Sequence, residues 1–362
     1  MTLWIPPSRR WAAALCFCGA LTIQSAVGQT SGALGQFEDQ GDVGTVLHPG
    51  TLSFDASQGS YSIAGSGENM WTTADAFHFV WKKFSGDVSI TADIVFPTKT
   101  GIPHKKAVLM IRQSLDADSA YVDATLHLDG LTSLQSRAEK GAATHEVGIA
   151  AASPTRLRLE KRGSEFFLYL ARAGEDLHLG GGSMRLALKE PFYIGLGVCA
   201  HDKDAVETAV FSNVSIAPPS QGKPKLHSTL ETISISSTDR RVVAVFDKRI
   251  EAPSWNPDGT ALVFKDGKQF EQIPAVGGKV ETVEHTRGRK KAAAEGASPD
   301  GLRVASLSHD AASKDVTLRV KTLSDGKEQV LAKLVGGKGT LGAWPWSPDS
   351  KRLVFVSYQL VP

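Results

Sequence analysis

Pairs of carboxylates are the first groups in this sequence that could do chemistry. Two acidic side chains that project into one cleft can cleave a glycosidic bond, one as acid and the other as nucleophile or base. Asp116 and Asp118 alternate, but the serines around them are typical of a turn. Asp123 and Asp129 are expected on one face of a strand, six residues and therefore about 20 Å apart. No acid pair with catalytic spacing is predicted, so we expect a protein without a catalytic site.

An enzymatic alternative stays open. It is a divergent glycoside hydrolase that uses Asp123 or Glu68 with Asp75. The H-x-x-x-H and H-E-x-x-H spacings of metal sites are absent, and so is the G-x-S-x-G turn of serine hydrolases. The two aspartates that follow His201 could hold a calcium ion, but a hairpin loop explains them better. We therefore predict no metal and no cofactor.

Aromatic and planar polar side chains form a candidate binding face. Flat rings and planar hydrogen-bonding groups suit sugars, which have apolar faces and polar edges. The competing interpretation is that the two tryptophans belong to the core and the other residues to the solvated surface. Arg112 follows the apolar run 108–111, so we expect a buried or half-buried carboxylate as its partner. The candidate ligand-binding residues are Trp71, His78, Trp81, Arg112, Tyr121, Asp123, His127 and Arg137.

The elements that must position these residues are strands. Apolar and polar side chains alternate in residues 87–96 and 120–129, so one face of each strand should be buried and the other hydrated. Both faces are apolar in residues 166–171, which suggests a central strand. Together with 35 glycines and 17 prolines, these segments predict a jelly-roll β-sandwich. Further strand-length segments lie at 156–160, 192–200 and 208–216.

Five segments of the first half also carry a recognisable pattern. They are GSGENMW at 65–71, ADAFHF at 74–79 with the later Gly86-Asp87, AVLMIRQS at 107–114, LRLEKRG at 157–163 and TAVFSNV at 208–214. Together they resemble the concanavalin-like domains, of lectin or glucanase type, found in bacterial secreted proteins. The resemblance covers residues 37–217 and implies a jelly-roll sandwich, in a family whose members mostly have no assigned reaction.

The second half contains an internal repeat. PSWNPDGTALVF at 253–264 recurs as WPWSPDSKRLVF at 344–355, and GASPDGLRVA at 296–305 is a weaker copy. Pro fixes φ for a turn, Asp caps it and Gly, present in two of the three copies, accepts the left-handed position, before a β-branched and aromatic strand. Units of roughly 40–45 residues with this layout are typical of propeller blades.

This repeat resembles the TolB-like, WD40-like propeller repeat, W-S-P-D-G followed by an apolar strand. The resemblance implies a binding platform around a central channel in a ring of six blades. Residues 225–362 suffice for about three blades. We therefore expect an incomplete β-propeller that exposes sheet faces and edges: an open arc, an arc that pairs with another chain, or an unstable domain. The stretch 284–295 has few apolar residues where a blade should continue, and its basic cluster, 287–291, is expected to be a solvated loop.

The chain begins like an exported protein. Arg9-Arg10, the apolar run 11–23 and the small residues Ala26-Val27-Gly28 predict a signal peptide cleaved after Gly28. We therefore expect a periplasmic or extracellular location, no membrane span after cleavage, and Cys199 as a lone buried cysteine. The Pro-rich segment 218–224 is expected to be the linker between a sandwich at 37–217 and a partial propeller at 225–362.

Net charge and its distribution along the chain limit the kinds of partner that we expect. The net charge of +2 gives no reason to expect nucleic acid. Residues 1–222 carry 18 basic and 22 acidic residues, net −4, and residues 223–362 carry 22 and 16, net +6. The sequence thus predicts an exported, non-catalytic binding or scaffold protein, whose sandwich binds a polysaccharide or peptide and whose propeller docks a protein partner. A TolB-like component that assists biopolymer transport in the cell envelope is a further alternative.

Overall fold

The computed structural model describes residues 1–2, 34–149, 153–284, 296–309, 315–337, 339–342 and 345–362. Every regular element among these residues is a strand, so the predicted all-β class is confirmed. Among them there is also no helix long and apolar enough to cross a membrane. From residue 3 onward the predicted signal peptide lies outside the described residues, and so does the basic cluster at 287–291.

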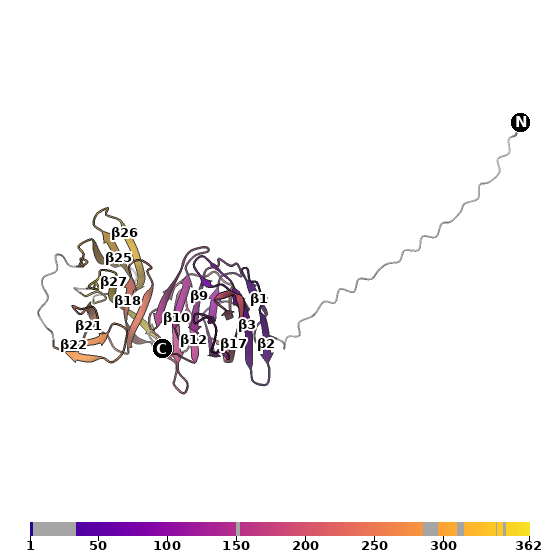
Figure 1. Ribbon diagram of the computed structural model, residues 1–362, viewed down its shortest axis with the longest axis horizontal. Coiled ribbons are helices and arrows are strands. Elements are labelled where there is room, and N and C mark those ends of the chain that lie inside the picture. The colour runs from indigo at the N-terminus through magenta and orange to yellow at the C-terminus, as the bar shows by residue number, and fades with distance from the viewer. Residues whose placement is uncertain (3–33, 150–152, 285–295, 310–314, 338, 343–344) are drawn as a thin grey trace.

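Two sheets packed face to face form the first half of the chain (Figure 1). The sandwich part of sheet A runs in the spatial order β1 (Asp39–Val43), β6 (Phe77–Phe84), β16 (Phe192–Cys199), β8 (Lys106–Arg112), β9 (Tyr121–His127), β10 (Thr132–Arg137) and β11 (Thr144–Ile149). Sheet B has the order β14 (His178–Leu179), β13 (Glu165–Ala171), β12 (Arg156–Arg162), β7 (Val88–Val95), β17 (Asp202–Ala217), β3 (Ser60–Gly67) and β2 (Thr51–Asp55). Two short additions are β15 (Met184–Arg185), which pairs with β13, and the hairpin of β4 (Met70–Trp71) and β5 (Ala74–Asp75).

The core between these sheets follows the predicted alternation. Ile90, Ala92 and Ile94 of β7 are buried in it, and so are Val122 and Ala124 of β9. Burial of one such side chain contributes about 1.5–3 kcal/mol when it leaves water completely. Alternating apolar residues on strands from both sheets therefore fix the register, because a slip by one residue would expose the whole apolar set.

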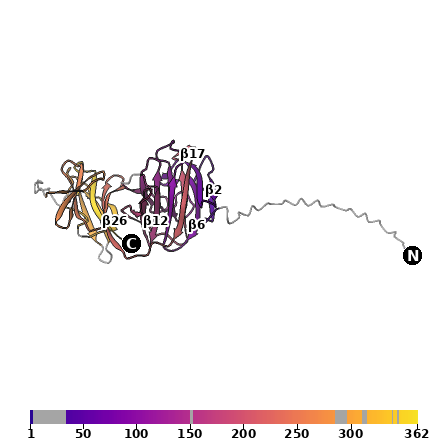
Figure 2. The ribbon, with the colours of Figure 1, turned by 90° about the horizontal axis from the view of Figure 1, so that it is seen from below.

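Sheet A does not end with the sandwich. Its edge strand β11 pairs in parallel with β19 (Arg240–Phe246), which continues to β18 (Lys225–Ser234) and β27 (Arg352–Val361). The ten-stranded sheet thus contains strands from both sides of segment 218–224, which the sequence predicts as a linker. Figures 1 and 2 show the two halves side by side from two directions, and Figure 1 labels β18 and β27 among the blades.

The described residues of the second half form three blades. The first blade contains β20 (Glu251–Trp255), β21 (Ala261–Asp266), β22 (Gln269–Pro274) and β23 (Glu281–Val283). The last blade contains β24 (Arg303–His309), β25 (Asp315–Thr322) and β26 (Glu328–Val335). The middle blade joins the beginning and the end of this half, because β18 and β19 pair with β27.

The middle blade separates the other two. Val354 and Val356 of β27 pack against the first blade, whereas Leu353 and Phe355 pack against the last blade. Successive side chains of a strand point to opposite faces, so the first and last blades cover opposite faces of the middle blade. This arrangement is an open arc of three blades, as predicted.

The repeat appears as three equivalent turns. In each, a backbone N–H donates to the carbonyl five residues later: Asn256 to Ala261 at 2.9 Å, Ser298 to Arg303 at 2.8 Å and Ser347 to Arg352 at 2.9 Å. The residue after each Pro-Asp pair has positive φ: Gly259, Gly301 and Ser350 at 77°, 72° and 61°. The turn chemistry that the sequence indicates is therefore present in all three copies.

The expected exposure of apolar sheet faces does not occur on the last blade. Val316, Leu318 and Val320 of β25 face the middle blade. The alternate residues Thr317, Arg319 and Lys321 point the other way. This outer face is mainly polar, with Val330 exposed beside Arg319, and needs no further blade to cover it, which is how a three-blade arc can end in solvent.

Candidate functional site

The face of sheet A that points away from sheet B carries most of the predicted binding residues. We call it the outer face. Its apolar half, on β1, β6, β16 and β8, is a second small core. Its polar half, on β8 to β11, brings together side chains in neighbouring register positions, namely Lys106, His127, Asp123, Thr125, Ser133, Gln135 and Glu146.

A loop that includes the β4–β5 hairpin covers this face. The Nζ of Lys106 donates to the carbonyl of Met70 at 2.9 Å, and the N–H of Thr144 on β11 donates to the carbonyl of Thr72 at 2.8 Å. At the other end the Cys199 Sγ lies 3.5 Å from the carbonyl of Gly67. The loop therefore spans the outer face from β16 to β11 and removes the strands below it from solvent.

Asp75 fixes the end of this loop. Its carboxylate accepts two hydrogen bonds from Arg137, at 2.7 and 2.9 Å, and Arg112 lies 3.5 Å away. All three side chains are fully buried. Arg112 also donates to the carbonyls of Ser114 and Asp116, at 2.6 Å each. The expected buried carboxylate partner of Arg112 is thus Asp75, and the cluster binds two loops to the sheet.

Asp123 is the most unusual group of the outer face. Burial raises its pKa to about 7, against the opposing effects of the Thr125 hydroxyl and Lys106. Thr125 donates to Oδ1 at 2.5 Å, whereas Oδ2 is buried without a hydrogen bond among the described residues. Burial also lowers the pKa of Lys106, and Asp123 opposes that effect. Two ionisable groups are therefore shifted toward their neutral forms beside each other.

The rim of the outer face is more accessible. The Nζ of Lys106 lies 5.4 Å from the centre of the Trp71 ring, which is half-buried. His104 lies 5.6 Å from His127 and 5.8 Å from His201, between ring centres. Burial lowers the pKa of His127 to about 3, and its Nδ1 donates to the carbonyl of Leu131 at 3.0 Å. Among the described residues no cluster of His, Cys, Asp or Glu could hold a metal ion.

The remaining predicted residues have internal partners. His78 donates from Nδ1 to Asp42 at 2.8 Å, with Gln40 Oε1 3.1 Å from Nε2. Trp81 is 9% exposed and stacks on Phe79 at 5.6 Å. The His78 contacts tie β6 to the edge strand β1, and Trp81 packs in the small core of the outer face, so both residues have a structural role here.

The prediction that these residues lie on a hydrated face is wrong. Seven of the eight are buried, and Trp71 alone among them is partly exposed. The physical reason is the loop 67–75, which covers the face that the alternation of β9 would leave to water. The structure does bring Asp123, His127 and Trp71 close to Lys106, while Arg112, Tyr121 and Arg137 gather around Asp75.

Sequence reasoning missed part of the polar cluster. Lys106, Gln135 and Glu146 were not among the candidates. A signal for Lys106 exists, because it shares the parity of Arg112 on β8. Nothing in the local pattern marks Glu146, whose pKa is raised by burial and by Asp239 of the second half.

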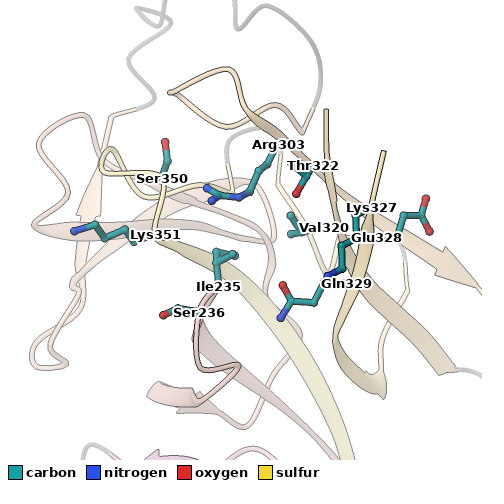
Figure 3. A pocket seen from close by; sticks show the side chains of 10 residues that line it. All are labelled: Ile235, Ser236, Arg303, Val320, Thr322, Lys327, Glu328, Gln329, Ser350 and Lys351. Atoms are coloured by element: carbon teal, nitrogen blue, oxygen red, sulfur yellow. The ribbon is translucent and has the colours of Figure 1, made fainter. Parts of the chain in front are cut away.

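An open groove lies elsewhere, between the last and middle blades. It encloses about 880 Å³. Figure 3 shows its lining residues on the strands of the last blade on one side and on two turns of the middle blade on the other. Arg303 and Gln329 point into the space between them, whereas Lys351 and Glu328 extend outward at its rim. The lining residues are Ile235, Ser236, Arg303, Val320, Thr322, Lys327, Glu328, Gln329, Ser350 and Lys351.

Comparison with known proteins gives weak likenesses. The sequence matches no protein-family profile. An uncharacterized protein of Agrobacterium fabrum is 28% identical over an alignment of 125 residues, which covers 30% of this chain and 40% of that protein. The chain therefore spans about two fifths of the length of this relative.

Solved structures resemble parts of the chain. A functionally unknown protein from Saccharomyces cerevisiae is 13% identical, with a TM-score of 0.38, and covers 47% of this chain and 93% of its own. The alginate lyase from Klebsiella pneumoniae is 11% identical, with a TM-score of 0.33 and coverage of 47% and 85%. A putative TolB from Agrobacterium tumefaciens is 16% identical, with a TM-score of 0.18 and coverage of 76% and 99%. These scores are too low to support an argument about function.

Proposed function

We propose that this is an exported, non-catalytic scaffold protein whose blades dock a protein partner. The observation that carries the proposal is the open groove of about 880 Å³ between the last and middle blades. The sandwich, in contrast, fills its outer face with its own side chains and loop. Binding sites are commonly concave surfaces with a few converging polar groups, and among the described surfaces this groove fits that description.

The carboxylates of the sandwich support a non-catalytic role. A glycoside hydrolase needs two carboxyl groups that reach the substrate. Asp75 is fully buried and bonded to Arg137, so it has no free lone pair directed to solvent. Asp123 is fully buried as well, and Glu68 lies exposed outside the Asp75 cluster. Neither pair of the enzymatic alternative, Asp123 with Asp75 or Glu68 with Asp75, therefore has two accessible members.

The connection between the halves suits a scaffold. Glu231 is fully buried and bonded to Arg240, at 2.6 and 2.8 Å, while Arg240 also donates to the carbonyl of Ser183 in the sandwich at 2.7 Å. At a second contact between the halves, Arg185 of the sandwich forms an ion pair with Asp315 of the last blade. A shared sheet, the buried Arg240 that reaches Ser183, and the partly exposed Arg185–Asp315 pair hold the groove in one orientation to the sandwich.

The proposal predicts binding without turnover. Purified wild-type protein should release no reducing ends from a panel of bacterial and plant polysaccharides, including alginate and xyloglucan. Release of sugar that is lost in D123N, with the fold retained by circular dichroism, would contradict the proposal.

A divergent glycoside hydrolase is the second candidate, favoured by one observation. Asp123 and Glu146 lie on the same face two strands apart, and burial raises the pKa of each. Raised carboxyl pKa values are typical of catalytic acids. E146Q and D123N should each abolish any hydrolysis if this candidate is correct, provided that the loop 67–75 opens to admit a sugar.

A further inference from the structure

Positive charge is concentrated in the groove between the last and middle blades. Three cationic side chains, Arg303, Lys327 and Lys351, line it, against the single carboxylate of Glu328. Ile235 and the buried Val320 supply an apolar floor. The remaining lining groups are hydroxyls and one amide, which can donate or accept hydrogen bonds.

Arg303 differs from its counterpart in the repeat. Arg352 occupies the same position after the Pro-Asp turn, and its guanidinium stacks over the ring of Trp255 at 4.9 Å, between the first and middle blades. Arg303 instead lines the groove, where its guanidinium points toward the Ser350 turn (Figure 3). Equivalent arginines therefore have different surroundings in the two interfaces.

The acidic neighbour of Arg303 pairs with it only loosely. Oδ2 of Asp300 lies 3.6 Å from Nη1 of Arg303, which is longer than a hydrogen bond. The other oxygen of Asp300, Oδ1, accepts from the Ser298 hydroxyl at 2.5 Å and from the N–H of Leu302 at 2.9 Å. The five donors of an arginine fork suit carboxylates, and Asp300 does not saturate those of Arg303.

We propose that this groove binds an acidic, extended peptide segment of a partner protein. The inference rests on the proposed docking function and names its ligand class. Carboxylates of the segment pair with Arg303 and Lys351, and its apolar side chains contact Ile235 and Val320. Its backbone meets Gln329 on the edge strand β26 and Thr322 at the end of the central strand β25. In Figure 3 the Gln329 amide points into the groove toward the Ile235–Ser236 turn, as a backbone-binding group should.

The dimensions and charge favour a peptide over other anions. A volume of about 880 Å³ exceeds what a single phosphate or sulfate needs and lies in the range of sites for larger ligands. Nucleic acid requires a long basic stripe that follows the phosphate backbone, whereas the three cations here surround one groove with an apolar floor. An acidic segment with interspersed apolar residues satisfies both features.

The test uses the full chain on a solid support and two peptide pools. One pool contains decapeptides randomised over Asp, Glu, Ser, Val, Leu and Tyr, and the other replaces Asp and Glu by Asn and Gln. Retention is measured by mass spectrometry at low and at high salt. R303Q and K351Q are the test variants. K321Q is the matched control, because Lys321 is exposed on the opposite face of the same blade.

The acidic pool should be retained at least about tenfold more than the amide pool, and the ratio should fall with salt because exposed ion pairs are screened. R303Q and K351Q should each reduce retention about three- to fivefold, in line with partly exposed charge pairs, and K321Q less than about twofold. Equal effects of K321Q and R303Q would overturn the proposal, as would full displacement of the peptides by inorganic phosphate at equal concentration. If the wild type retains both pools equally and R303Q retains neither, the groove binds peptides, but the proposal of an acidic ligand is refuted. Retention of neither pool would refute the acidic groove, whereas the proposed scaffold role is refuted separately by catalytic turnover.

Discussion

Replacement of Asp75 by Asn should destabilise the sandwich strongly. The side chain keeps its shape but loses its charge, so the guanidinium groups of Arg112 and Arg137 remain fully buried without a counter-charge. Removing one partner of a buried ion pair costs roughly 3–5 kcal/mol, because the other charge is left unpaired in a medium of low polarity. The loss here should lie in this range, since Asp75 serves two arginines.

Asp116 provides the matched control. It pairs with Lys140 at 2.6 Å in the neighbouring loop, but the two side chains are 57% and 62% exposed. Exposed pairs contribute about 0–1 kcal/mol. Urea denaturation followed by tryptophan fluorescence should therefore separate D75N from D116N by at least about 2 kcal/mol in the free energy of unfolding. If D75N unfolds within about 1 kcal/mol of the wild type, Asp75 does not hold the loop in the way described.

Three further predictions concern other parts of the chain. D123N should become more stable relative to the wild type as pH rises from 4 to 8: the folded pKa of about 7 lies above the ordinary 3.8, so ionisation favours the unfolded state, by up to roughly 4 kcal/mol above pH 7. Parallel denaturation curves at every pH would refute that reasoning. E231Q should lower stability by about 3 kcal/mol and divide thermal unfolding into two calorimetric transitions, because it removes the buried counter-charge of Arg240, which itself bonds the Ser183 carbonyl of the sandwich; a single unshifted transition would contradict it. G67A should cost more than about 1 kcal/mol by urea denaturation, because Gly67 has a φ of 110° and a Cβ there would lie 1.9 Å from the Ala76 carbonyl oxygen, whereas an unchanged midpoint would count against the loop geometry.

Local patterns predicted much of the fold. The alternation in residues 87–96 and 120–129 corresponds to β7 and β9, and its apolar residues lie in the core between the sheets. The three Pro-Asp turns also form as their residue types indicate. In both cases the structure depends on residues that are close in sequence or that alternate with a period of two. The local sequence is therefore enough to predict it.

The candidate site was harder to predict because a second layer covers it. The alternation of polar and apolar residues along β9 predicts that Asp123 faces away from the core between the sheets, and the structure confirms this. It cannot indicate that the loop 67–75 will cover that side, since the loop is held by Asp75 through arginines on β8 and β10. For the same reason the sequence could not show that β11 and β19, nearly a hundred residues apart, pair in one sheet.

The middle blade is built from strands at both ends of the second half, and this limits the order in which the chain can assemble. Its strands β18 and β19 are synthesised before the first and last blades, whereas β27 comes after both. Until then β19 has the finished sandwich edge at β11 as a template, but β18 has no neighbour on its other side. A chain that emerges from the ribosome or a translocation pore in this direction thus completes its sandwich early, and the final ten residues of sheet, 352–361, lock the blades last.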